Sequence, residues 1–296
     1  MAKKKAARRA QLRRSCGAMA AHMMLLERYP AFRVAQMRLE GVTDRRRQTR
    51  FDAARTKLVR IKTVVNVVYK TAEQNISDAQ INSQIAALNK DYRAKNSDRN
   101  QAPAPWKGLV TDVRMEFRLV KVTRTQTTQN SFTFDDKVKK SSTGGIAPFE
   151  PKTHLNLWVC ALGGGLLGYA QFPGGPQATD GVVINYHAFG TTGTAQVPFD
   201  KGRTATHEIG HYFNLRHIWG DTEDCSGSDM VADTPNCAGP NYGTPSWPQI
   251  TCNNGPNGDM FMNYMDYTDD AGMFMFTAQQ VLRIRTALDT ARSGLA

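Results

Sequence analysis

The stretch HEIGHYFNLRH at residues 207–217 restricts this chain more than any other feature of its sequence, because it gathers three of the six histidines. Residues four apart lie one turn from each other on one face of a helix. His207 and His211 can therefore direct their imidazoles at one zinc ion, while Glu208 lies beside them without being a ligand. The alternative is a helix that happens to be rich in histidine.

A third ligand at His217 requires the helix to end, because a helix that simply continued would carry this residue to another face. Asn214 is where we expect the turn, since asparagine is the non-glycine residue best suited to the left-handed conformation. Three neutral imidazoles leave a fourth zinc position for water, whose pKa the metal lowers towards 7. Glu208 can accept the proton of that water and pass it to a leaving amine, so the motif predicts a zinc-dependent peptide hydrolase.

The pattern of the body, from about residue 61, predicts an α/β domain. Residues 61–69 are rich in valine and predict a buried strand, and SDAQ at residues 77–80 is a capping box that opens a helix. Four further segments have the pattern of strands: 113–119, 155–159, 166–171 and 182–186. TAQQ at residues 277–280 is a second capping box and opens a terminal helix. Residues 220–259 show little periodicity, so we expect an irregular segment held by something other than a core.

The charge distribution separates a basic leader from this body. Residues 1–60 hold 17 Lys or Arg against 4 Asp or Glu, whereas the remaining residues hold 21 against 22. Helices are expected at residues 18–28 and 31–40, followed by an exposed, cleavable hinge at 45–50. The leader could bind nucleic acid or an anionic surface, or it could be removed. No secretory signal is recognised at residues 1–14, and no apolar run is long enough to span a membrane.

Together with NYMDY at residues 263–267, the histidine segment resembles the metzincin metallopeptidases and, within them, the pappalysin family. The resemblance covers most of residues 61–296. It implies an α/β metzincin fold with a mixed twisted sheet, two long helices of which the second carries the zinc ligands, and a largely irregular C-terminal subdomain that ends in a helix. We expect a catalytic domain at residues 56–296, with an upper subdomain at 56–217, a lower subdomain at 218–296 and the active cleft between them.

The resemblance also implies roles for single residues. Met265 is the methionine of the turn beneath the zinc, although a plain core methionine is the alternative, and Tyr267 supports the tetrahedral intermediate. Asp270 stands where family members that cut before arginine or lysine carry an acid at the floor of the S1′ pocket; the alternative is a solvated loop aspartate. The strand that aligns the substrate, again by resemblance, contributes three residues: Leu167, Gly168 and Tyr169.

Cys16 lies within RRSCG at residues 13–17, which resembles the cysteine switch of metzincin zymogens. Its thiolate would take the fourth zinc position, with the nearby arginines favouring the ionised form. Residues 1–55 would then be a propeptide that inhibits its own enzyme and that the enzyme could cut at residues 45–50. The alternative is a solvent-exposed thiol.

The family resemblance pairs Cys225 with Cys252 in a disulfide, which would clamp the irregular segment. Cys160 is expected to be a buried thiol, and the state of Cys237 stays open. The stretch 221–233 holds five acidic residues. Here the relatives bind structural Ca²⁺, and the matching ligands are Asp229, Val231, Asp233 and Thr234; a plain acidic surface loop is the alternative. A disulfide and calcium favour secretion, so we expect an extracellular enzyme.

We therefore expect a zinc metalloendopeptidase made as a zymogen, with protein or peptide substrates, a preference for arginine or lysine at P1′, and no nucleic-acid or membrane partner. One alternative is a metzincin of broad specificity. Another is a non-catalytic zinc protein whose basic leader binds nucleic acid or a surface. Glu208 and Tyr267 favour the enzyme, because a scaffold needs neither. The physiological substrate and the oligomeric state stay open.

Overall fold

The computed structural model describes residues 13–49 and 57–296. The leader forms two helices, α1 (Ala18–Arg28) and α2 (Pro30–Gln48). In the body, the helices are α3 (Asp78–Asp91), the short α4 (Ala104–Lys107), α5 (Arg203–Tyr212) and α6 (Ala278–Asp289). The strands are β1 (Val59–Tyr69), β2 (Met115–Gln126), β3 (Leu155–Cys160), β4 (Gly168–Ala170) and β5 (Val182–Asn185).

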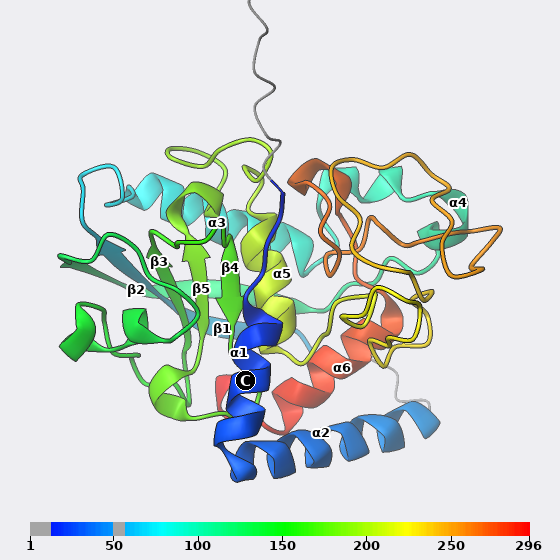
Figure 1. Cartoon of the computed structure of the whole chain (residues 1–296), viewed down its shortest axis with the longest axis horizontal. Coiled ribbons are helices and arrows are strands. Elements are labelled where there is room, and N and C mark those ends of the chain that lie inside the picture. Colours follow the sequence, from blue (N-terminus) through cyan, green and yellow to red (C-terminus); the bar gives the residue numbers. More distant parts are fainter. Residues whose placement is uncertain (1–12, 50–56) are drawn as a thin grey trace, which may run out of the picture.

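One mixed sheet of five strands organises the body, in the order β2-β1-β3-β5-β4 (Figure 1). The first four strands are parallel, and β4 alone runs antiparallel to its neighbour β5. This arrangement confirms the predicted α/β class and mixed sheet. The short antiparallel strand β4 therefore lies at an edge of the sheet, and, among the described residues, no other strand of the sheet binds the backbone groups on its outer side.

Alternate side chains of the central strands enter two different cores, as the two-residue period of a strand requires. On β3, Leu157 and Val159 pack into the main core with helices α3 and α5, whereas Trp158 and Cys160 pack into a smaller core on the opposite face. Both faces of the sheet are therefore covered, and α5 is held against β4 and β5.

Both capping boxes begin helices where the sequence predicts. The Ser77 hydroxyl accepts the Gln80 N–H at the start of α3, and Thr277 and Gln280 make both reciprocal bonds at the start of α6. From residue 220 to 259 the chain has no helix or strand, which confirms the irregular segment. A disulfide between Cys225 and Cys252 crosses it, as the resemblance implied.

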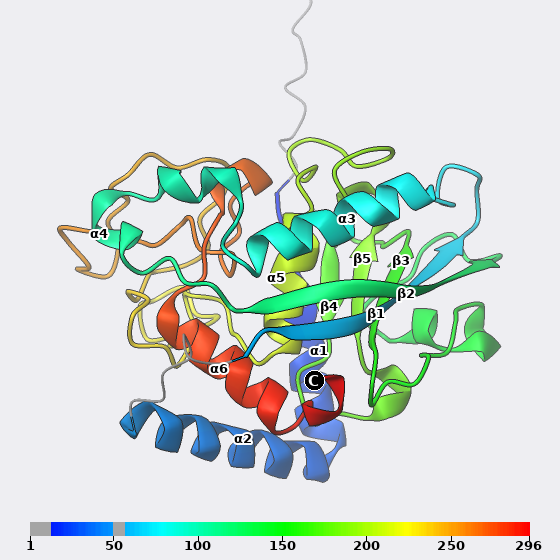
Figure 2. The same cartoon turned by 180° about the vertical axis from the view of Figure 1, so that it is seen from behind.

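The leader differs from the prediction at its second helix. α1 has the predicted bounds, but α2 continues eight residues beyond the expected end at residue 40 and includes Arg45, Arg46 and Arg47. These arginines therefore belong to a helix and not to an exposed hinge, and Arg46 pairs with Asp289 of α6 at 2.8 Å. The helix continues because it packs against α6, below which it runs in both views (Figures 1 and 2). Arg50 lies outside the described residues.

Among the described residues, no helix is long and apolar enough to cross a membrane. The other differences from prediction are small. β4 is shorter than residues 166–171, and β2 runs on to Gln126, beyond the alternating pattern at 113–119. The alternation stops early because the second half of β2 lies at the open edge of the sheet and is largely exposed.

Candidate active site

Helix α5 carries His207, Glu208 and His211 on buried turns and ends at the point that the third histidine requires. Asn214 is left-handed, with a φ of +73°, and the Leu215 N–H donates to the Gly210 carbonyl at 2.9 Å. This hydrogen bond closes the helix end and reverses the chain. As a result, His217 returns to the two histidines of the helix.

The ligating atoms of the three histidines and of Cys16 lie within 4.8 Å of one another. Nε2 of His211 is 3.1 Å from Nε2 of His207 and 3.1 Å from Nε2 of His217. Each ring has an acceptor at Nδ1, which places the hydrogen there and leaves the Nε2 lone pair facing the other rings. Three such imidazoles and one thiol are a donor set that fits tetrahedral zinc.

Burial and the neighbouring imidazoles favour the neutral form of His207 and His211. Loss of solvation first, and the nearby histidines next, lower the pKa of His207 well below its usual value. The pKa of His211 is lowered in the same way, by burial and then by His217. Neutral imidazole is the form that binds a metal.

Glu208 is 1% exposed and lies next to the cluster. Its Oε2 accepts a hydrogen bond from the Cys16 thiol at 3.3 Å. Burial raises the pKa of Glu208 to about 8, in the range that suits a group exchanging protons near neutral pH. Gly168 makes room for it, because a Cβ at that position would lie 2.8 Å from the Glu208 Cγ.

Tyr267 and Met265 border the cluster from the segment that follows the irregular loop. The Tyr267 hydroxyl accepts the Cys16 N–H at 3.2 Å, and its ring meets the His217 ring edge to face at 4.9 Å. Met265 is fully buried against α5, where a Cβ on Gly210 would come within 2.5 Å of its Sδ. The glycine of the histidine motif therefore allows the methionine to pack directly against the helix.

The leader crosses this site as an added strand beside β4. The Leu167 N–H donates to the Ser15 carbonyl and the Gly17 N–H to the Gly168 carbonyl, both at 2.9 Å, in a parallel bridge. The edge strand thus uses its free backbone groups, as β-augmentation requires. The side chain of Tyr169 points into the smaller core, so of this residue only the backbone faces the edge.

Arg14 reaches Asp270, and both side chains are almost completely buried. Its Nη2 lies 2.6 Å from the Asp270 Oδ1, its Nη1 donates to the Thr204 hydroxyl and its Nε to the Thr268 carbonyl. Asp270 also accepts the backbone N–H groups of Lys201 at 2.8 Å and Arg203 at 3.2 Å. The alternative of a solvated loop aspartate is therefore wrong.

This pairing corrects the electrostatics expected for Cys16. The arginines do not favour its thiolate, because Arg14 is neutralised by Asp270 and Arg13 stacks over Tyr242 at 4.9 Å. Enclosure of the thiol first, and the Glu208 carboxylate next, raise the pKa of Cys16 well above its usual value. Cys16 is nevertheless placed at the cluster, so the alternative of a solvent-exposed thiol is wrong as well.

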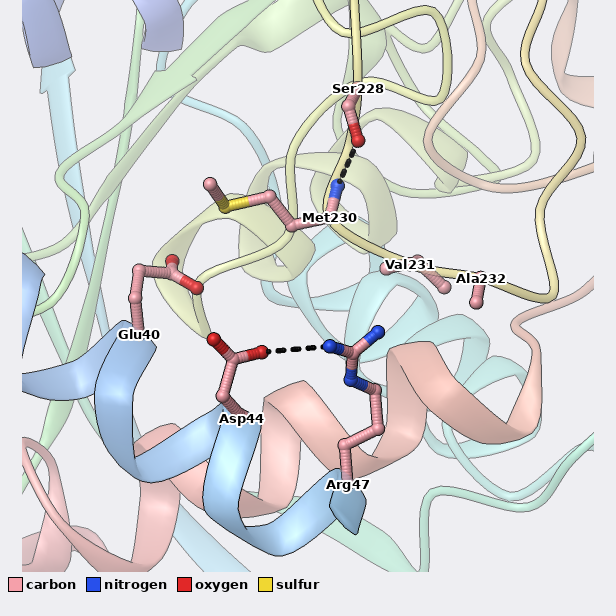
Figure 3. Close-up of a pocket in the computed structure, with 7 residues that line it drawn as sticks. All are labelled: Glu40, Asp44, Arg47, Ser228, Met230, Val231 and Ala232. Atoms are coloured by element: carbon pink, nitrogen blue, oxygen red, sulfur yellow. Dashed lines mark hydrogen bonds and ion pairs between the residues drawn. The ribbon is translucent and has the colours of Figure 1, made fainter.

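The leader contacts the body at a second place, at Asn214, just after the end of α5. Glu40 of α2 accepts the Asn214 side-chain N–H at 3.1 Å and two hydrogen bonds from Arg283 of α6, at 2.6 and 2.9 Å. These bonds lower the pKa of Glu40 against the opposing effect of burial. Glu40 and Asp44 also line a pocket between α2 and the loop of residues 228–232 (Figure 3).

That loop belongs to the segment expected to bind calcium. Asp229 is buried and accepts the Thr234 hydroxyl at 2.7 Å, and the same hydroxyl lies 3.1 Å from the Val231 carbonyl. Burial raises the pKa of Asp229 to about 7. The carboxylate of Asp233 turns to the start of α6, where it accepts the Thr277 hydroxyl and the Gln279 N–H.

Three contacts of the site were not predicted from the sequence: Arg14 with Asp270, Glu40 with Asn214, and Asp221 with His217. The first two join residues more than 170 positions apart, and no local pattern indicates such pairs. Asp221 follows His217 by four positions, so its spacing was a usable signal. Cys160 and Cys237 are free thiols, and both are buried.

Comparison with known proteins agrees with this geometry. Residues 149–289 match the family model of peptidase M43, described as pregnancy-associated plasma protein-A. An extracellular metalloprotease of Arthroderma otae is 32% identical over 245 residues, which cover 80% of each chain. A second one, of Trichophyton verrucosum, is 32% identical over 246 residues with the same coverage.

Solved structures are also similar. Mature mirolysin of Tannerella forsythia, in complex with a cleaved peptide, is 47% identical with a TM-score of 0.79 and covers 81% of this chain and 96% of its own. A promirolysin mutant of the same organism is 42% identical with a TM-score of 0.85 and covers 95% of this chain and 97% of its own. Fold and histidine cluster together define a zinc-dependent metallopeptidase of the metzincin class. The chain belongs to peptidase family M43, the pappalysins.

Proposed function

We propose that this chain is the zymogen of a zinc metalloendopeptidase that cleaves peptide bonds before arginine or lysine. The observation that carries the proposal is Arg14, whose guanidinium lies against the buried carboxylate of Asp270 at 2.6 Å. The guanidinium that the protein itself places against Asp270 supports a preference of this site for a basic side chain. A substrate arginine would find the same acceptors: Asp270, the Thr204 hydroxyl and the Thr268 carbonyl.

In the proposed mechanism, His207, His211 and His217 hold the zinc. Bound there, zinc supplies Lewis acidity and lowers the pKa of water towards 7. Glu208 accepts a proton at its carboxylate and delivers it to the leaving amine. The Tyr267 hydroxyl, which holds a backbone N–H of the leader, is available to donate to the oxyanion once the leader has left.

Substrate alignment falls to the backbone of Leu167 and Gly168. These two residues already bind an extended segment through two hydrogen bonds of 2.9 Å. We propose that a peptide substrate uses the same edge after the leader is removed. Tyr169 then contributes by filling the core beneath the edge.

Inhibition by the leader follows from the same contacts. Cys16 supplies the fourth donor of the cluster, its thiol engages Glu208 and its N–H engages Tyr267. Cys16 thus takes the fourth ligand position of the metal and also engages both the proposed base, Glu208, and the proposed oxyanion donor, Tyr267. Consistent with a propeptide at residues 1–55, the match to promirolysin covers 95% of this chain and the match to mature mirolysin only 81%.

We further propose that the catalytic domain comprises residues 56–296, with subdomains at 56–217 and 218–296. Met265 and Asn214 would support the zinc site. We also propose that the protein is secreted, in keeping with relatives named extracellular metalloproteases. Structural Ca²⁺ near Asp229 is the last element of the proposal. The oxygens of Asp229, Val231 and Thr234 already converge there, and the Asp233 carboxylate would have to turn from the start of α6 to join them.

The test is digestion of a denatured protein mixture by the enzyme freed of its leader, with and without a zinc chelator, with cleavage sites read by mass spectrometry. We expect chelator-sensitive cuts before Arg and Lys. Asp270→Asn should lower kcat/KM for such sites by about 10- to 1,000-fold, because the guanidinium loses its charged partner. Asp269→Asn, one position earlier and partly exposed, is the matched control.

The possible outcomes test the specificity, the peptidase mechanism and the calcium site separately. Chelator-sensitive cuts without a preference would favour the metzincin of broad specificity and discard the role of Asp270. Unchanged selectivity in Asp270→Asn would do the same. Absence of cleavage after the leader has been removed would contradict the peptidase mechanism built on Glu208. A rise in thermal stability with added Ca²⁺, abolished in Asp229→Asn, is expected if the calcium proposal holds.

A further inference from the structure

The three clustered histidines are not held alike. Nδ1 of His207 lies 2.7 Å from the Tyr264 carbonyl, and Nδ1 of His211 lies 2.8 Å from the Leu215 carbonyl. Nδ1 of His217 instead lies 2.5 Å from a carboxylate oxygen of Asp221. Two of the rings therefore have a neutral backbone partner, and His217 alone has a charged one.

We propose that Asp221 is the positioning residue of the third zinc ligand. Its carboxylate holds the Nδ1 hydrogen of His217, turns Nε2 towards the other two histidines and makes this imidazole a stronger donor. The inference rests on the zinc site proposed above, and it assigns to Asp221 a role that neither the histidine motif nor the loop of acidic residues predicts.

The backbone between the two residues is shaped for this contact. The Gly220 N–H donates to the His217 carbonyl at 2.9 Å, and Gly220 and Asp221 are both left-handed, with φ of +67° and +60°. A Cβ at Gly220 would lie 2.0 Å from the backbone nitrogen of Ser228, so only glycine fits there. Two successive left-handed residues are costly for an ordinary loop, and here they bring Asp221 back to the ring four positions earlier.

Trp219 fixes the other degree of freedom of the His217 ring. The two rings stack with centroids 4.3 Å apart and an angle of 6° between their planes. Stacking sets the plane of the imidazole, and the Asp221 contact sets its rotation within that plane. The Trp219 ring also meets Tyr267 edge to face at 4.7 Å, so a displaced His217 would disturb the packing of the tyrosine too.

Charge adds to orientation. The Asp221 side chain is 27% exposed, whereas the ring that it contacts is 2% exposed. A carboxylate behind an imidazole compensates the positive charge that a bound divalent metal brings, which a carbonyl does only through its dipole. Removal of the carboxylate is therefore expected to weaken metal binding even where the geometry survives.

The experiment compares Asp221→Asn and Asp221→Ala with the wild-type full chain. Asparagine keeps an acceptor oxygen of similar shape without the charge, and alanine removes both. Asp224→Asn is the matched control, since Asp224 lies in the same loop, is exposed and accepts hydrogen bonds from Ser226 and not from the histidine cluster. Zinc content is measured after equilibration with graded concentrations of a competing chelator.

We expect Asp221→Asn to bind zinc about 10- to 100-fold more weakly than wild type, Asp221→Ala at least as weakly, and Asp224→Asn within about twofold of wild type. Substitution with Co²⁺ gives a second readout, because its visible spectrum reports ligand geometry. That spectrum should change in both Asp221 variants and stay constant in the control.

The inference is overturned if Asp221→Asn and Asp221→Ala both keep zinc affinity within about twofold and an unchanged Co²⁺ spectrum. Should the alanine variant fail to fold, the near-isosteric asparagine variant decides the question alone. A wild-type chain that binds no zinc would instead contradict the proposed function, so the two failures are distinguishable.

Discussion

At the scale of single residues, the site is built from side chains that each meet more than one requirement. Glu208 lies beside the histidine cluster and also accepts the Cys16 thiol. Asp270 pairs with Arg14 and also accepts two backbone N–H groups. The Asp270 carboxylate is therefore held by the backbone of Lys201 and Arg203 as well as by the leader.

Cys16 is the residue at which latency is most easily tested. Cys16→Ala removes the thiol from the cluster and from Glu208 while it keeps the backbone N–H to Tyr267. We expect the full chain to gain up to about 10-fold in basal peptide cleavage, since loss of the thiol hydrogen bond, which contributes about 0.5–1.5 kcal/mol, shifts the leader towards the open state. The measurement is hydrolysis of a fluorogenic arginine peptide.

The control for this prediction is Ser15→Ala, because Ser15 contributes its backbone carbonyl and not its hydroxyl to the Leu167 contact. This variant should stay as latent as wild type. Equal activity of both variants would show that the thiol is not what keeps the zymogen inactive.

At the scale of elements, the leader is attached at two places that lie on either side of α5. The extended segment before α1 pairs with β4 in front of the helix, and α2 lies against α6 beyond its end (Figure 1). Between them, Ala18, Leu25 and Phe32 pack with Phe172 of the body. The leader is therefore held by an ion pair, a metal-site residue, an apolar cluster and a helix contact, and no single one of them accounts for its docking.

Glu40 is the centre of the attachment through α2. Glu40→Gln leaves the Arg283 guanidinium without its charged partner, which we expect to weaken leader docking by about 1.5–3 kcal/mol. Activation by limited trypsin digestion should then be faster by about 10-fold or more. Asp44→Asn, one turn further along α2 and paired with the exposed Arg47, is the control and should activate at the wild-type rate.

His22 predicts how docking depends on pH. Burial lowers the pKa of this α1 histidine to about 4, from its usual 6.5. A histidine whose pKa is lowered by docking stabilises the docked state above its free pKa, and that stabilisation is lost as the pH falls from 6.5 towards 4. Acid should therefore loosen the leader, because release allows His22 to take up a proton.

The measurement is amide hydrogen exchange of α1 in the full chain between pH 7 and pH 4.5, corrected for the intrinsic pH dependence of exchange. Protection should fall more steeply in wild type than in His22→Leu, which has no proton to gain. Parallel pH profiles of the two proteins would contradict the prediction. The lowered pKa of Glu40 acts in the same direction, but its contribution is lost only below its usual value of 4.5, so it should not produce a steep loss of protection in the variant over this range.

At the scale of the whole molecule, an ordered sheet and an irregular segment share one active site. The sheet supplies β4 and supports α5, and the irregular segment supplies Asp221 and leads to Tyr267 and Asp270. Figures 1 and 2 show this division, with the sheet on one side of α5 and the loops of residues 220–270 on the other. A segment without regular structure must be stabilised by specific cross-links.

The Cys225–Cys252 disulfide is the strongest such cross-link. Replacement of both cysteines by serine should lower the free energy of unfolding by roughly 3–4 kcal/mol on the chain-entropy model for a loop of this length. Urea denaturation of the full chain measures this loss. Cys160→Ser is an unsuitable control because that thiol is buried in the core, whereas a reducing agent acting on wild type should reproduce the effect of the double replacement.

The sequence by itself determined the features that depend on neighbours in the chain. Local helix geometry explains the spacing of His207 and His211, the left-handed turn at Asn214 and the two capping boxes. Each of these features involves residues only a few positions apart, so the residue types at those positions predict it. The strand positions follow from apolar runs and alternation, and the bounds of α1 follow from its composition and from Pro30 at its end. The family resemblance, and not spacing, supplied the disulfide.

Only the tertiary structure decided which distant residues meet. Arg14 and Asp270 are 256 positions apart, and Glu40 and Arg283 are 243 apart, so their contacts depend on how the leader packs against two separate parts of the body. The same packing extends α2 through Arg45, Arg46 and Arg47, which the sequence alone assigns to an exposed hinge. A local pattern fixes backbone conformation over a few residues, whereas a buried ion pair forms only after the whole chain has brought its two charges together.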